Sequence, residues 1–131
     1  MNRSDEIASA LASIKSELPE QCTLIVVTKN FPISDVEILY RLGHRDCGEN
    51  RDEEGASKSA AMPDDLRWHF QGQIQSKKIK SIVSWADYLH SLDDIGHAAK
   101  LDTAARDLGK SLKSFIQINL DTDDNRTQQI G

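Results

Sequence analysis

One lysine stands where its amine could react. Lys29 follows the most apolar run of the chain, LIVVT at 24–28, at the position where a strand is expected to end. An amine that is partly desolvated at such a position favours its neutral form, and a neutral amine can attack an aldehyde. The alternative is a surface lysine whose aliphatic stem lies along the strand end while its ammonium group stays in water. The position of Lys29 in the sequence by itself favours the surface lysine, and the reactive lysine is kept as the second interpretation.

Two further polar residues follow later segments of the chain. Asn50 ends the tripeptide GEN at 48–50, which is typical of a turn that opens a helix and requires no chemistry. His69 lies between Trp68 and Phe70. A histidine in such an apolar segment is more often a hydrogen-bonded core residue than a catalytic base. For both Asn50 and His69, a purely structural role and a functional role are therefore both kept as interpretations.

Motifs and composition exclude several classes of protein. The chain has no G-x-G-x-x-G, no G-x-x-x-x-G-K-[ST] and no G-x-S-x-G, so nucleotide binding and serine hydrolysis have no motif to support them. No H-E-x-x-H or C-x-x-C favours a metal site. A formal net charge of -5, from 16 basic and 21 acidic residues, argues against nucleic acid or a membrane surface as partner. Without an apolar leader, the two cysteines are expected to be reduced thiols in the cytoplasm.

The elements that must position these residues form a repeating alternation. Apolar residues at helical spacing predict an N-terminal helix over 4–18, and strands alternate with helices from residue 23 onward. The expected strands are 24–28, the first of them buried on both faces, then 44–47, 66–70, 86–89 and 114–119. Such alternation predicts an α/β fold with a parallel sheet. We expect residues 1–131 to form one domain: either the first five strands of a (β/α)8 TIM-type barrel or an open doubly wound five-stranded sheet.

Three blocks of the sequence occur in an order and spacing known from one family. VVTKN at 26–30, DCGENRDEEGASK at 46–58 and LRWHFQGQIQSKKIK at 66–80 resemble the pyridoxal phosphate homeostasis proteins, and IQINLD at 116–121 fits as well. The resemblance implies a barrel like the N-terminal domain of alanine racemase, with pyridoxal 5'-phosphate (PLP) held as a Schiff base on Lys29. By the same matching of motifs, Asn50 lies beside the cofactor and His69 belongs to the binding site.

The resemblance also implies a function. A protein of this kind binds PLP without catalysis, for intracellular homeostasis of the cofactor, and PLP-dependent apo-enzymes are possible recipients. Two other classes stay open: a PLP-dependent amino-acid racemase, which needs a second acid/base group that the sequence does not identify, and a cofactor-free α/β binding module.

Length sets a further expectation. Family members run to well over two hundred residues, so the chain is expected to be the N-terminal, truncated part of such a protein, without the late loops that hold the phosphate. The first and fifth strands of a partial barrel each lack a neighbour. We therefore expect self-association through these exposed strand edges, or a marginally stable monomer.

Overall fold

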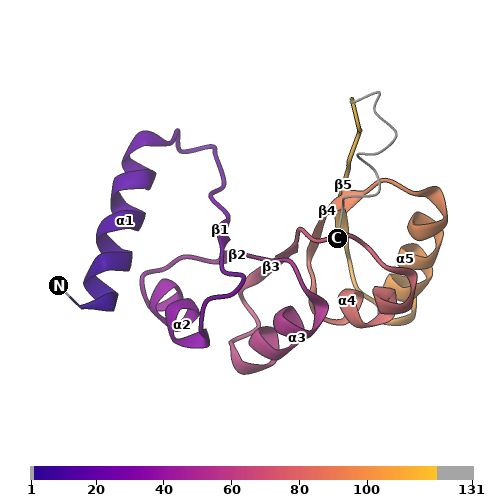
Figure 1. The fold of residues 1–131 in the computed structure, drawn as a ribbon, viewed down its shortest axis with the longest axis horizontal. Coiled ribbons are helices and arrows are strands. Elements are labelled where there is room, and N and C mark those ends of the chain that lie inside the picture. Colours follow the sequence, from indigo (N-terminus) through magenta and orange to yellow (C-terminus); the bar gives the residue numbers. More distant parts are fainter. Residues whose placement is uncertain (1, 121–131) are drawn as a thin grey trace.

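A computed structural model describes residues 2–120 as a sheet of parallel strands joined by helices (Figure 1). The N-terminal helix predicted over 4–18 is present as α1, Arg3–Glu17. It begins at Asn2, whose side chain accepts a hydrogen bond from the Asp5 N–H at 2.8 Å, and it ends before Pro19. The other elements are β1 Val26–Val27, α2 Ile33–Arg41, β2 Asp46–Glu49, α3 Asp52–Ala61, β3 Arg67–Phe70, the 3-10 helix η1 Ser76–Lys78, α4 Ile79–Trp85, β4 Tyr88–Leu92, α5 Ile95–Asp107 and β5 Lys113–Ile116.

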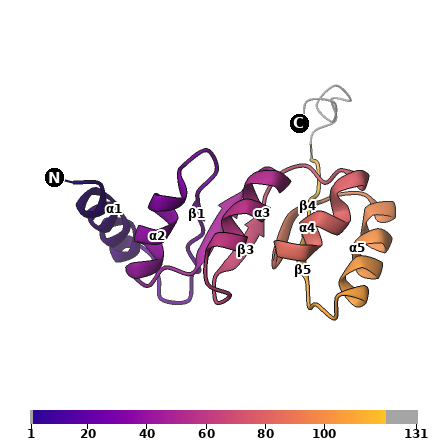
Figure 2. The same ribbon diagram turned by 90° about the horizontal axis from the view of Figure 1, so that it is seen from below.

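The strand order decides between the two predicted architectures. All four strand pairs are parallel, and the order in the sheet is β1-β2-β3-β4-β5. A doubly wound sheet reverses direction at a switch point, which this order lacks. Right-handed crossovers that always step in one direction place their helices on one face of the sheet, and α2–α5 do lie on one face (Figures 1 and 2). The arrangement is that of a partial barrel, and the doubly wound alternative was wrong.

The core lies between the sheet and these helices. Cys47 and Trp68 are paired in register, as are Phe70 and Leu89, and all four side chains are buried on the helix-covered face. The helices contribute the other half of this core, with Val36, Ile79, Ile82, Val83, Trp85, Leu101, Ala104 and Ala105. Among residues 2–120, no helix covers the opposite face of the sheet, here called the open face (Figure 1).

Several predicted boundaries were wrong, for identifiable reasons. β1 is two residues long and is not buried on both faces: Val27 is 45% exposed, because it lies on the open face of an edge strand. β2 begins two residues later than predicted and includes Gly48 and Glu49, which the sequence had suggested for a turn. β4 likewise begins two residues late, at Tyr88. Within residues 2–120, no helix is long and apolar enough to span a membrane.

Candidate functional site

Lys29 and Asn50 follow the neighbouring strands β1 and β2 at the carboxyl end of the sheet. Val27 pairs with Gly48, and Gly48 pairs with His69, so these three residues form one row across the strands. The ladder continues past the strand ends, because the Thr28 N–H donates to the Gly48 carbonyl and the Gln71 N–H to the Glu49 carbonyl, both at 2.8 Å. Side chains alternate between the faces of a sheet, so we expect the residues two positions further to continue the row on the open face. This row, Lys29, Asn50 and Gln71, is called the open-face row below.

The side chains of the open-face row are not engaged by the rest of the described chain. Lys29 and Asn50 are exposed and Gln71 is half-buried. Among residues 2–120, none of the three side chains takes part in a hydrogen bond or an ion pair. An amine, a carboxamide and a second carboxamide are therefore available to a ligand at one edge of the sheet.

Gly48 and Gly72 allow the segments that carry the open-face row to lie close together. A Cβ at Gly48 would lie 2.5 Å from Gln71 Oε1, so the Gln71 side chain occupies the space that any larger residue would fill. A Cβ at Gly72 would lie 2.1 Å from the backbone oxygen of Asn50. The loop after β3 can approach the loop after β2 this closely only because Gly72 has no side chain.

Lys29 sits in a tight turn. The Phe31 N–H donates to the Thr28 carbonyl at 3.1 Å, which closes a four-residue turn with Lys29 and Asn30 at its centre. Asn30 has a φ of 67°, in the left-handed region that asparagine tolerates better than most residues. The turn fixes where the Lys29 side chain leaves the backbone.

A buried charge cluster lies beneath this turn. Glu49 is fully buried, and its Oε2 accepts from Lys58 Nζ at 3.0 Å and from the Thr28 hydroxyl. Its Oε1 has no hydrogen-bond partner among the described residues. Burial raises the pKa of the Glu49 carboxyl, against the opposing hydrogen bonds from Thr28 and Lys58. Lys58 also pairs with Glu54 at 2.7 Å.

His69 lies one row below, in a polar network of the open face. Its Nε2 lies 2.9 Å from Asp46 Oδ1, its Nδ1 lies 2.9 Å from His90 Nε2, and its ring stacks on Tyr88 with 4.5 Å between centroids. Arg67 donates to both Asp46 carboxylate oxygens, at 2.8 and 2.7 Å.

These contacts set the charges of the network. Burial opposes ionisation of Asp46, but the hydrogen bonds from Arg67 and His69 outweigh it and hold the pKa of that carboxyl below its usual value. Burial, and to a lesser extent the neighbouring His69 ring, lowers the pKa of His90. Asp46 is thus the anion of the network, balanced by Arg67.

Lys29 and Asn50 thus follow adjacent strands at the carboxyl end of the sheet, and His69 lies in β3 with both ring nitrogens engaged. Sequence reasoning missed the roles of Glu49, Glu54 and Lys58. The only local signal for them is the i, i+4 spacing of Glu54 and Lys58, which is typical of an ion pair on a helix but does not show that the pair lies under the Lys29 turn.

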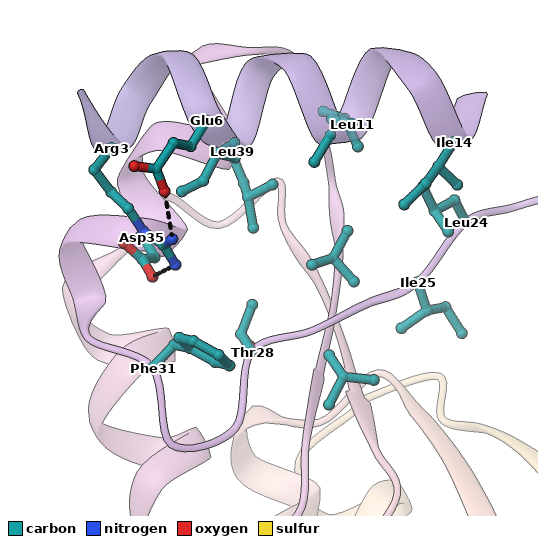
Figure 3. A pocket seen from close by; sticks show the side chains of 14 residues that line it. Arg3, Glu6, Leu11, Ile14, Leu24, Ile25, Thr28, Phe31, Asp35 and Leu39 are labelled. Carbon is teal, nitrogen blue, oxygen red and sulfur yellow. Dashed lines mark hydrogen bonds and ion pairs between the residues drawn. The ribbon is translucent and has the colours of Figure 1, made fainter. Parts of the chain in front are cut away.

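A cavity of about 530 Å³ lies elsewhere, between α1 and β1 (Figure 3). Its wall is mostly apolar, and the ion pair between Arg3 and Asp35 stands at one end, with 2.7 Å between Nη2 and Oδ2. Lys29, Asn50 and His69 do not line it. This cavity and the open-face row are separate features.

Comparison with known proteins confirms the resemblance predicted from the sequence. No family model matches the chain. Over 121 residues, 91% of its length, it is 37% identical to the pyridoxal phosphate homeostasis protein of Synechocystis sp., covering 56% of that protein. Its fold matches PipY of Synechococcus elongatus solved without PLP, with a TM-score of 0.85, 40% identity and coverage of 91% of this chain and 56% of PipY.

A second PipY structure, solved with PLP bound, matches with a TM-score of 0.84 and 36% identity, covering 95% of this chain and 65% of PipY. The chain spans about half the length of the curated relatives it matches.

Proposed function

We propose that this chain, similar over nearly its whole length to the N-terminal part of pyridoxal phosphate homeostasis proteins, binds PLP through Lys29 and serves intracellular PLP homeostasis. The observation that carries the proposal is the open-face row. It presents an exposed amine next to two carboxamides at the carboxyl end of the sheet, none of them bonded to other described residues. Ligands of barrel proteins gather at this end.

The chemistry of the row fits an aldehyde cofactor. In its neutral form the Lys29 amine attacks the aldehyde carbon, a C=N bond replaces the C=O bond, and one water molecule leaves. Asn50 and Gln71 offer amide donors and acceptors to the polar groups of the ring. His69 is proposed to act from below, as a hydrogen-bonded support of the open face rather than through a free ring nitrogen.

The proposed role is binding without catalysis. Racemisation requires an acid/base group on the side of the cofactor opposite the lysine. The two tyrosines are not placed for it in the described structure: the Tyr40 hydroxyl donates to Asp65 at 2.7 Å, and the Tyr88 ring stacks on His69 one row below. The chain saturated with PLP should therefore racemise L-alanine no faster than free PLP does. A faster rate that is lost in Lys29→Ala would refute this part of the proposal.

The covalent link is tested by absorption spectroscopy and by labelling. PLP added to the unmodified chain should give an imine absorption band that Lys29→Ala lacks and the matched control Lys80→Ala, at an exposed lysine, retains. Borohydride reduction and peptide mapping should then find the label mainly on Lys29. Label spread equally over Lys29, Lys77 and Lys100 would contradict a special site.

A further inference from the structure

The two peptide groups that flank Lys29 are each held by a side chain of α3. The Thr28 carbonyl, which precedes Lys29, accepts from Lys58 Nζ at 2.7 Å. The Asn30 N–H, which follows Lys29, donates to Glu54 Oε2 at 2.6 Å. One residue, Lys29, therefore lies between two backbone groups that are clamped from the same helix.

The clamp is itself rigid. Glu54 and Lys58 are one helical turn apart on α3 and form an ion pair of 2.7 Å. Lys58 is buried and is also bonded to the fully buried Glu49 at 3.0 Å. Its three bonds saturate the three hydrogens of the ammonium group, so Lys58 has no free donor and does not compete with Lys29 for an aldehyde.

The turn needs this support. Asn30 is in the left-handed region, the only residue other than glycine with a positive φ in the described structure. A residue keeps such a conformation only where several surrounding contacts hold it in place. Without an acceptor for its N–H, Asn30 loses one of the contacts that favour this conformation, and the direction of the Lys29 side chain is no longer fixed.

We propose that Glu54 and Lys58 are positioning residues for the Lys29 amine, holding the Thr28–Asn30 backbone so that the amine stands on the open face beside Asn50. This inference rests on the proposed function for the identity of Lys29 as the reacting group. It adds two residues, 25 and 29 positions away in the sequence, that touch no ligand and act through the backbone.

The test uses Glu54→Ala, because Glu54 is partly exposed and its loss leaves the buried pair of Lys58 and Glu49 intact. Hydrogen exchange of the Asn30 amide should accelerate at least tenfold. After treatment with PLP and borohydride, the ratio of label on Lys29 to label on the exposed Lys100 should fall at least threefold. Glu54→Gln keeps an acceptor oxygen and should restore most of both values.

Glu53→Ala is the matched control. Glu53 is the neighbouring residue on α3 and pairs with Lys78 instead, so its loss should change neither measurement. An unchanged labelling ratio and unchanged Asn30 exchange in a folded Glu54→Ala variant would overturn the inference. If that variant does not fold, Asn30 exchange in the unmodified chain decides: protection supports the clamp, and exchange at the rate of a free peptide overturns it.

The outcomes separate the two proposals. Equal labelling of Lys29 and Lys100 in the unmodified chain overturns the proposed function, and with it any effect of Glu54 on labelling. A preference for Lys29 that is undiminished in Glu54→Ala, together with unchanged Asn30 exchange, overturns the positioning role alone.

Discussion

Gly72→Ala places a methyl group where the loops after β2 and β3 meet. The added Cβ would lie 2.1 Å from the Asn50 backbone oxygen and 3.0 Å from its carbonyl carbon. Both are backbone atoms, which cannot rotate away as a side chain can. The two loops must therefore separate by roughly 1 Å, and overpacking of this kind costs about 1 to 3 kcal/mol.

We expect Gly72→Ala to lower the free energy of unfolding by about 2 kcal/mol, which for a chain of this size lowers the melting temperature by on the order of 5 to 10 °C. The measurement is thermal unfolding followed by circular dichroism. Backbone amide chemical shifts should move most around residues 50–52 and 72–74, since these segments separate.

Gly96→Ala is the control for the general effect of replacing a glycine by alanine. Gly96 lies in α5, where alanine gains up to about 1 kcal/mol over glycine. The nearest atom to its Cβ is the end of the Asp94 side chain, at 3.0 Å, which can move. Because Asp94 caps α5 by accepting from the Gly96 and His97 N–H groups, moving its side chain offsets the gain from alanine, and Gly96→Ala should leave the melting temperature almost unchanged. A Gly72→Ala variant as stable as Gly96→Ala would refute the close approach of the two loops and, with it, the geometry of the open-face row.

Two further predictions concern the open face and the sheet edge. Because the pKa of Asp46 is lowered in the folded protein, the Asp46 carboxylate stabilises the fold above the usual pKa near 3.8, and this effect is lost as pH falls through the folded pKa. Asp46→Asn should therefore lower the free energy of unfolding by about 1 to 2 kcal/mol at pH 7, a figure discounted for the half-exposed Arg67. In urea unfolding, the difference between the two proteins should vanish below pH 4, and a constant difference down to pH 2.5 would contradict the assignment. The edge strand β5 is exposed, with Ile116 75% exposed, and should make the chain associate with a second copy as concentration rises. In sedimentation velocity, Ile116→Lys should weaken this association, whereas Ile95→Lys, at an exposed position on α5, should not. Equal behaviour of the two variants would exclude the β5 edge as the site of association.

The sequence alone was enough for the α/β class and for most of the helices. Apolar spacing predicted α1 to within one residue at each end, because a surface helix needs only one apolar stripe and local caps. The motif blocks around Lys29, Asn50 and His69 predict a resemblance to the pyridoxal phosphate homeostasis proteins, and the comparisons confirm that resemblance. These signals are local in the chain.

The strand order, by contrast, was decided by tertiary structure. A repeating alternation of strands and helices is compatible with both a barrel and a doubly wound sheet, since each unit of either fold has the same local pattern. The pairings of β1 with β2 and of β2 with β3 each join residues 21 positions apart, such as Val26 with Cys47 and Cys47 with Trp68. No local pattern specifies which strand a given strand will pair with.

The surroundings of each polar residue were likewise decided by the fold. His69 meets Asp46 and His90, 23 and 21 positions away, only because three neighbouring strands pair in this register. The tripeptide GEN at 48–50 predicted a turn at Glu49, and a buried carboxylate in a strand is unfavourable unless a partner is buried with it. That partner, Lys58, comes from the helix packed over the same strand, and electrostatic partners of this kind exist only once the chain has folded.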